Sequence, residues 1–173
     1  MFKIISCINK KNAIGLSGKT LYTIKNDMAN FKSMTMNNVV IMGRKTFESI
    51  SNGKPLENRI NIILTSNPDY SVNGEFDNVY IVYSIKDVIE LCDAFFSDKE
   101  LFVIGGEFVY KEFLDSGLVD EMRLTIVNDN ADGDTFFPQF NTDEWQTYYK
   151  SMAQVSTNNK VEKSFYYQIL KKK

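Results

Sequence analysis

The chain has 173 residues, which is enough for one domain with a substantial hydrophobic core. Hydrophobic residues make up 43% and charged residues 24%, and the net charge of −2 indicates no basic surface for nucleic acid or anionic membranes. Histidine is absent, which excludes Ser-His and Cys-His nucleophile pairs and most zinc sites, so no metal site is expected. Cys7 and Cys92 lie in apolar stretches without CxxC spacing and are expected to be buried thiols of a soluble cytoplasmic protein.

The first third of the chain alternates between strand and helix patterns. Residues 2–8 predict a buried strand, in an apolar run too short for a signal peptide or a membrane span. Residues 12–20 are polar and contain glycine, which is typical of a loop. A helix is expected from Thr23, a suitable N-cap, and its apolar stripe comprises Ile24, Met28, Phe31 and Met34. A buried strand at 39–42 and a short helix at 45–50 follow.

The same alternation continues to about residue 127. Strands are expected at 59–64, 79–82, 101–104 and 121–127. Helices are expected after Ser84, which is a suitable N-cap, and from Glu107. A polar loop then runs through Pro138, and two more strand-like segments lie around Tyr148 and at 165–170.

This order of elements predicts one α/β domain over residues 1–173. Unbroken apolar strands that alternate with helices indicate a largely parallel sheet covered on both faces. The last third has consecutive strands without helices, which favours an antiparallel addition at one edge of the sheet. No linker, repeat or low-complexity segment divides the chain.

Three of the expected strands end in residues suited to binding phosphate. GRKT follows Met42, Thr65-Ser66 follows Leu64, and GGEFVY follows Ile104. Ligands of parallel sheets bind at the carboxyl ends of the strands, where helix N-termini favour anions. The alternative is ordinary capping of solvated helix starts, because short basic clusters are mostly solvated. Neither a Walker pattern nor GxGxxG is present, so the prediction depends on the three strand ends together.

Asp27 is an acid on the face of its helix that should be buried. It falls with Ile24, Met28 and Phe31 on the helical wheel. One interpretation is a first-turn acid at the rim of the core, favoured by the helix dipole. The other is a carboxylate at the back of an apolar pocket, placed to accept hydrogen bonds from paired N–H donors of a ligand.

These segments, in this order, resemble the dihydrofolate reductase family. The similarity covers essentially the whole chain and is carried by ISCINKKNAIGLSG, VVIMGRKTFESI, RINIILTS, LFVIGGEFVYKEFL, RLTI and GDTFFP. It implies a central, mostly parallel sheet of eight strands with an antiparallel C-terminal edge and flanking helices. It also implies NADPH-dependent reduction of 7,8-dihydrofolate to 5,6,7,8-tetrahydrofolate, which supplies one-carbon metabolism and thymidylate synthesis.

The resemblance implies roles for the substrate residues. Asp27 is expected to bind the amino group and ring N–H of the pterin with support from Thr125, and Tyr22 to orient a water near the pterin. Arg59 is expected to pair with the α-carboxylate of the glutamate tail. The other residues expected to line the substrate pocket are Ile5, Ser6, Met28, Phe31, Ile50 and Ile104.

For NADPH, the resemblance implies contacts from several loops. Ile14 and Leu16 are expected to border the nicotinamide, residues 43–46 and 105–109 to hold the pyrophosphate, and Arg44 and Ser66 to bind the 2′-phosphate. The peptide between Gly105 and Gly106 is expected to be cis. The full set of expected contacts is Cys7, Ile14, Gly15, Leu16, Gly43, Arg44, Lys45, Thr46, Leu64, Thr65, Ser66, Ile104, Gly105, Gly106, Glu107, Phe108, Val109, Tyr110 and Thr135.

Two positions depart from the family's pattern. Leu21-Tyr22 stands where Leu-Pro-Trp is usual before the acid-bearing helix, and Phe108 stands where many bacterial members have an arginine beside the 2′-phosphate, so Lys45 is expected to compensate.

Two other functions suit the same fold. A pyrimidine reductase of riboflavin synthesis would keep the glycine pair but would need neither Asp27 nor Arg59, and a non-catalytic nucleotide-binding module would need no catalytic acid. The presence of Asp27, Arg59 and Thr125 together favours dihydrofolate reduction. The expected partners are dihydrofolate and antifolate inhibitors, and the expected state is a monomer that binds neither nucleic acid nor membrane.

Overall fold

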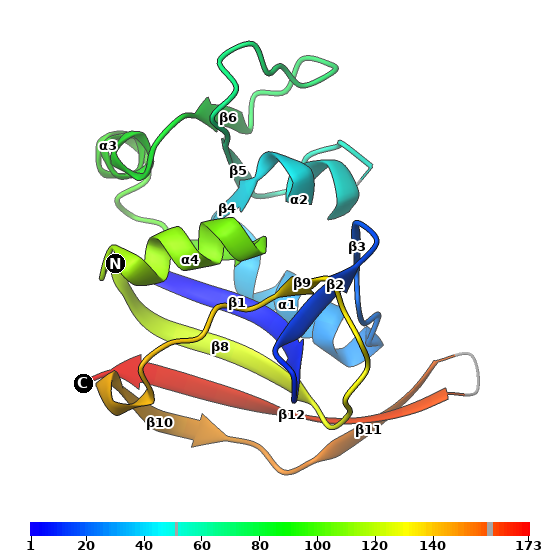
Figure 1. The fold of residues 1–173 in the computed structure, drawn as a ribbon. Helices are drawn as coiled ribbons and strands as arrows, with labels where there is room; N and C mark the ends of the chain where they lie inside the picture. The colour runs from blue at the N-terminus through cyan, green and yellow to red at the C-terminus, as the bar shows by residue number, and fades with distance from the viewer. Residues whose placement is uncertain (51, 159–160) are drawn as a thin grey trace.

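The computed structural model describes residues 1–50, 52–158 and 161–173, and Figure 1 shows their arrangement around one large sheet. The elements of the first half are β1 (Phe2–Asn9), β2 (Ala13–Leu16), β3 (Lys19–Thr20), α1 (Lys25–Thr35), β4 (Val39–Gly43), α2 (Arg44–Ile50), β5 (Ile60–Leu64) and β6 (Val79–Val82). Those of the second half are α3 (Ile85–Phe95), β7 (Leu101–Gly105), α4 (Glu107–Asp115), β8 (Val119–Val127), β9 (Thr135–Phe136), the 3₁₀ turn Thr142–Glu144, β10 (Trp145–Lys150), β11 (Gln154–Asn158) and β12 (Val161–Lys172).

The large sheet confirms the predicted topology. Its strand order is β10-β12-β8-β1-β7-β4-β5-β6, and all neighbours from β8 to β6 are parallel. β12 is antiparallel to β8 and β10 is antiparallel to β12, so the C-terminal part of the chain forms the antiparallel edge. β11 also pairs with β12, which adds a ninth strand that the sequence did not predict.

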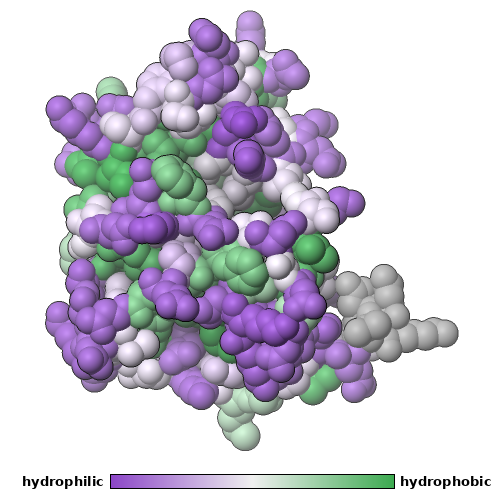
Figure 2. Space-filling model, viewed as in Figure 1, coloured by the Kyte–Doolittle hydropathy of each residue, from purple (hydrophilic) through white to green (hydrophobic). Residues whose placement is uncertain are grey.

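Alternating side chains of the central strand β4 enter two different cores. Val39 and Ile41 pack with Val88 of α3 and Phe113 of α4, while Val40 and Met42 pack on the opposite face with residues of α1 and α2. The two faces are therefore both covered, with α4 and α1 on opposite sides of the sheet (Figure 1). On the face shown in Figure 2, hydrophilic residues are interspersed with apolar ones. None of the helices in the described ranges is long and apolar enough to cross a membrane.

The start of α1 differs from the prediction. The helix begins at Lys25, and its N-cap is Ile24 in an extended conformation rather than Thr23. This start lets the Ile24 side chain pack against Val127 and Phe165, and burial of an apolar side chain outweighs a hydroxyl cap. Met28 is 56% exposed and so does not extend the buried stripe. Ser84 caps α3 as predicted, accepting a hydrogen bond from the Asp87 backbone N–H.

Residues 12–20 and the loop before Pro138 also differ from the prediction, because they contain short strands. β2 pairs with β3 and with β9 in a separate small sheet. Their shortness hid these strands, since each is at most four residues long and so shows no clear period-2 pattern. β5 begins one residue later than predicted, which leaves Arg59 just outside the strand, and β8 begins two residues earlier, at Val119.

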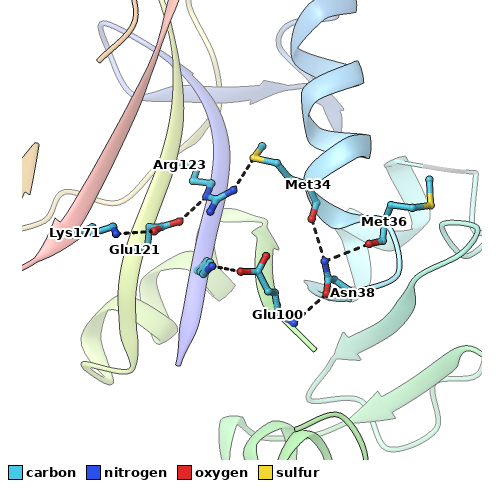
Figure 3. A network of polar contacts seen from close by, with 8 residues as sticks. Met34, Met36, Asn38, Glu100, Glu121, Arg123 and Lys171 are labelled. Atoms are coloured by element: carbon cyan, nitrogen blue, oxygen red, sulfur yellow. Dashed lines mark hydrogen bonds and ion pairs between the residues drawn. The ribbon is translucent and has the colours of Figure 1, made fainter. Parts of the chain in front are cut away.

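A polar network at the other end of α1 fixes this helix against the sheet (Figure 3). The Arg123 guanidinium of β8 donates to Glu121 and to the sulfur of Met34 in the last turns of α1. The Asn38 amide donates to the Met34 and Met36 carbonyls, and its own oxygen accepts from the Glu100 backbone N–H. The Arg123–Met34 contact joins α1, which carries Asp27, directly to β8.

We expect Gly105→Ala to destabilise the fold strongly. Gly105 has φ +111°, and a Cβ there would lie 2.9 Å from the Tyr110 ring. Positive φ and overpacking together should lower the free energy of unfolding by about 2–5 kcal/mol, measured by urea denaturation. Gly18→Ala is the matched control, because φ is +74° but nothing lies within 4 Å, and about 1 kcal/mol is expected. If Gly105→Ala and Gly18→Ala lowered the free energy of unfolding equally, packing against Tyr110 would not constrain position 105.

Candidate active site

The three strand ends singled out by the sequence meet in the structure. A Cβ on Gly43 at the end of β4 would lie 3.1 Å from Val109 of α4 and 4.0 Å from the carbonyl oxygens of Gly105 and Leu64. A Cβ on Gly106 would lie 3.2 Å from the Thr46 hydroxyl of α2. The ends of β4, β5 and β7 therefore adjoin the first turns of α2 and α4. We call Gly43, Gly105 and Gly106 the glycine cradle.

The glycine cradle leaves backbone donors accessible at the start of α4. The Gly105-Gly106 peptide is cis, as the resemblance implied. Gly106 is the N-cap of α4 and has no side chain. The backbone N–H groups of the first turn therefore receive no hydrogen-bond acceptor from the N-cap residue's side chain. Behind them, the buried Tyr110 hydroxyl donates to the Ile5 carbonyl oxygen at 2.7 Å and holds α4 against β1. Free N–H groups at a helix start suit an anion such as a phosphate.

The residues expected to bind the 2′-phosphate lie at the same carboxyl edge of the sheet, but their surroundings differ. The Arg44 Nη1 donates to both carboxylate oxygens of Glu48, at 3.0 and 3.1 Å. Lys45 and Ser66 are exposed. Thr65 is buried, and its hydroxyl oxygen accepts from the Asn67 backbone N–H.

Asp27 lies on the inner side of α1, against the carboxyl half of the sheet. Thr125 of β8 donates its hydroxyl hydrogen bond to the Asp27 carboxylate. Burial raises the pKa of the Asp27 carboxyl above its ordinary value, although hydrogen bonds from Thr125 and Cys7 act in the opposite direction. The contact with β8 favours the interior carboxylate over the acid at the rim of the core.

Cys7 reaches the same carboxylate from the neighbouring strand. It is the register partner of Thr125, so the two side chains stand next to each other on one face of the sheet. Burial and the nearby Asp27 raise the pKa of the Cys7 thiol, which therefore stays neutral and can donate a hydrogen bond. Asp27 thus has two neutral donors on the sheet side.

Most of the expected substrate-lining residues lie together on this face. Ile5, Phe31 and Ile50 are half-buried and pack on one apolar cluster that contains Ile104. Ser6 does not join them, because successive side chains of β1 face opposite sides of the sheet. It is buried beside Tyr110 on the other face.

Arg59 is a buried cation bound to neutral oxygens. It is 8% exposed, and its guanidinium donates to the Glu57 carbonyl at 3.0 Å and the Thr35 hydroxyl at 3.2 Å. Burial lowers the pKa of Arg59. Among the described residues, no carboxylate forms an ion pair with it. Thr35 and Phe31 belong to α1, so the cation lies at the far end of the helix that carries Asp27.

The remaining expected contacts belong to the small sheet. Gly15 of β2, between Ile14 and the exposed Leu16, is paired with Thr135 of β9. The Phe136 backbone N–H donates to the Glu107 carboxylate at 3.0 Å, which ties β9 to the first turn of α4. Phe108 is exposed and Val109 is buried in that turn. The small sheet therefore adjoins the glycine cradle.

Sequence reasoning missed a cluster around Tyr22. Its hydroxyl donates to Asp129, whose carboxylate also accepts from Lys163 of β12 and from the Ala131 backbone N–H. Although burial acts in the other direction, the hydrogen bonds from Lys163 and Tyr22 lower the pKa of Asp129 to about 2. The expected role of Tyr22 in orienting a water stays a prediction. Asp129 lies in a polar loop, where no periodicity marks it.

The parallel sheet, the glycine cradle and the interior carboxylate together define a nucleotide-dependent α/β enzyme. The family model described as dihydrofolate reductase matches residues 1–171, and the chain belongs to this family. It is an oxidoreductase of that family.

Named relatives agree with this assignment. The dihydrofolate reductase of Staphylococcus aureus is 32% identical over 162 residues, covering 94% of this chain and 93% of the relative. That of Bacillus subtilis strain 168 is 37% identical over 146 residues, covering 84% and 80%. A solved structure of dihydrofolate reductase from Enterococcus faecalis, complexed with NADP(H) and RAB-propyl, has a TM-score of 0.84 at 29% identity and covers 99% of this chain and 96% of that chain.

We expect Asp129→Asn to change how stability depends on pH. The folded pKa of Asp129 is below its ordinary value, so its stabilising effect is present above about pH 4 and is lost as the pH falls through about 2. At pH 7 the variant should lose about 1.5–3 kcal/mol of unfolding free energy, the range for hydrogen bonds to a charged group. Its difference from the wild type should disappear in acid. Urea denaturation from pH 2 to 7 measures both.

Asp132→Asn is the control for this prediction. Asp132 lies in the same loop as Asp129 and forms a solvent-exposed ion pair with Lys11. Among the described residues, no hydrogen bond joins Asp132 to Tyr22. Its substitution should change stability much less. If the two variants behaved alike, the Tyr22–Asp129–Lys163 cluster would contribute no more than a surface ion pair.

Proposed function

We propose that this protein catalyses the NADPH-dependent reduction of 7,8-dihydrofolate to 5,6,7,8-tetrahydrofolate, with Asp27 binding the pterin. The observation that carries this proposal is the interior carboxylate of Asp27, held by Thr125 on the face lined by Ile5 and Phe31. Family membership supports the reaction, because the matched relatives are named for it. The small-molecule partners we propose are dihydrofolate, NADPH and antifolate inhibitors, bound by a monomer.

The residues at the strand ends fit NADPH. The glycine cradle contributes no side chains of its own at the start of α4, where backbone N–H groups would hold the pyrophosphate. Arg44, Lys45 and Ser66 would bind the 2′-phosphate, and the β2 residues would border the nicotinamide. When bound, the cofactor supplies the hydride. The protein orients the pterin beside it and excludes water.

In this proposal Asp27 orients the pterin and favours its protonated form electrostatically. A carboxylate accepts paired N–H donors, so Asp27 would fix the pterin by its amino group and ring N–H. Its negative charge would favour the protonated pterin, with the proton reaching the ring nitrogen through water. Thr125 and Cys7 keep the carboxylate oriented while their side chains stay neutral.

Arg59 completes the substrate site in this proposal. The buried Arg59 guanidinium donates hydrogen bonds to two neutral oxygens of the protein. Its other N–H groups can then donate to a ligand carboxylate. The glutamate tail of dihydrofolate carries such a group. A pyrimidine reductase would require neither this cation nor Asp27, so their presence supports a folate substrate.

We expect Asp27→Asn to lower the rate of hydride transfer at neutral pH by about 100-fold or more, because the amide keeps the shape but loses the charge. The rate should recover partly in acid, where more substrate arrives protonated. The wild-type rate should fall as the pH rises through one ionisation above that of an ordinary Asp, because the proton lost there belongs to the coupled pair of pterin and Asp27 and is the proton that the reaction uses. Pre-steady-state measurement of hydride transfer across pH tests both profiles.

Two controls separate this effect from a structural one. Asp27→Asn should keep or increase the free energy of unfolding, because burial of the charged carboxylate opposes folding. Asp87→Asn removes a first-turn acid of α3 and should leave hydride transfer unchanged. A wild-type pH profile in Asp27→Asn would return Asp27 to the role of a helix-start acid.

We expect Arg59→Lys to raise the KM for dihydrofolate by roughly 10- to 100-fold, because lysine cannot form two parallel hydrogen bonds to a carboxylate. The KM for NADPH should change little, and a pterin without the glutamate tail should react equally well with both proteins. Steady-state kinetics with the two pterins provide the measurement. An unchanged KM for dihydrofolate would contradict the assigned contact.

A further inference from the structure

Arg44 already has an anionic partner within its own helix. Glu48 lies one turn further along α2, and both of its carboxylate oxygens accept from Arg44 Nη1, at 3.0 and 3.1 Å. The two side chains are 37% and 44% exposed, so the pair stands in solvent at the edge of the sheet. The guanidinium also lies 5.8 Å from the Tyr70 ring centroid, which limits the directions in which it can move.

This pairing distinguishes Arg44 from Lys45. In the part of the chain that the structure describes, no carboxylate forms an ion pair with Lys45. A phosphate that approaches Lys45 meets a cation alone, whereas one that approaches Arg44 meets a cation and a carboxylate together. The position proposed for the cofactor's 2′ group therefore presents both charges.

We propose that Glu48 is a specificity-determining residue that reduces the preference for NADPH over NADH. The proposal rests on the proposed function, because it requires the cofactor's 2′ group to lie at Arg44. A 2′-phosphate carries close to two negative charges, which the Glu48 carboxylate repels at short range. The 2′-hydroxyl of NADH is instead a hydrogen-bond donor, and an acidic side chain is a good acceptor for it.

Glu48 therefore disfavours the binding of NADPH and favours the binding of NADH. With NADPH, the phosphate must displace Glu48 from Arg44 or share the guanidinium with it. An exposed pair four residues apart on a helix is weak, so this displacement is possible but unfavourable. With NADH, Glu48 can remain on Arg44 and accept the ribose hydroxyl at the same time, since a carboxylate has several acceptor positions.

The test compares wild type with Glu48→Gln, which keeps the size of the side chain and removes its charge. The measured quantity is the ratio of kcat/KM with NADPH to kcat/KM with NADH, at saturating dihydrofolate. The ratio should rise about 3- to 10-fold in the variant, as expected for one charge at short range in a solvated site. Added salt should reduce the difference between the two proteins, because both charges are exposed.

Glu90→Gln is the matched control. Glu90 forms the same type of pair with Lys86 on α3, a helix that carries none of the expected cofactor contacts, and its substitution should leave the ratio unchanged. An unchanged ratio in Glu48→Gln would overturn the proposal. A lower ratio would also overturn it, since Glu48 would then hold Arg44 in place for the phosphate.

Failure of the proposed function gives a separate result. If wild type oxidises neither cofactor with dihydrofolate, the reaction assigned here is wrong. The role of Glu48 is then decided by the dissociation constants of NADP⁺ and NAD⁺, measured by fluorescence quenching in both proteins. Tighter NADP⁺ binding and weaker NAD⁺ binding in Glu48→Gln support the role, and equal changes for both cofactors contradict it.

Discussion

The hydrogen bond from Thr125 to Asp27 is the contact on which the site depends. It joins α1 to β8 at the carboxyl side of the sheet and holds a carboxylate where burial disfavours its charge. The rest of α1 is placed to maintain this contact, with Ile24 buried at one end and Met34 bound by Arg123 at the other. A carboxylate kept in such a position opposes folding, and the pterin-binding role that we propose for Asp27 would account for its presence.

Parallel strand pairing brings the second half of the site to the same place. Because β4, β5 and β7 run in one direction, their carboxyl ends lie at one edge, and the helices that follow β4 and β7 begin there. Glycine at 43, 105 and 106 lets these ends approach closely. In the proposed function, the pterin-binding carboxylate and the cofactor phosphates are thus brought together by one sheet. Cys7 lies on β1, which is next to β7, and Thr125 lies on β8, on the other side of β1.

Much of this arrangement follows from the sequence, and the exceptions have physical reasons. Apolar runs and helical periodicity located the large sheet and the four α-helices of the described residues, and the strand-end motifs GRKT and GGEFVY located the cradle. Asp27 stood out because an acid on an apolar face requires a partner. The strands β2, β9 and β11 escaped prediction, since short strands depend on pairing with other segments of the fold. The Asp129 cluster escaped for the same reason: Tyr22, Asp129 and Lys163 are joined by the fold alone.

The central claim is that Asp27 is an interior carboxylate tuned by Thr125. Its most direct test is the pKa of Asp27 in the free protein, measured by carboxyl ¹³C NMR in wild type and in Thr125→Val, where valine keeps the shape of threonine without the donor. The account predicts a wild-type pKa above the ordinary value of about 3.9 and a further rise in the variant. A wild-type pKa at or below that value, or one that Thr125→Val leaves unchanged, would contradict it.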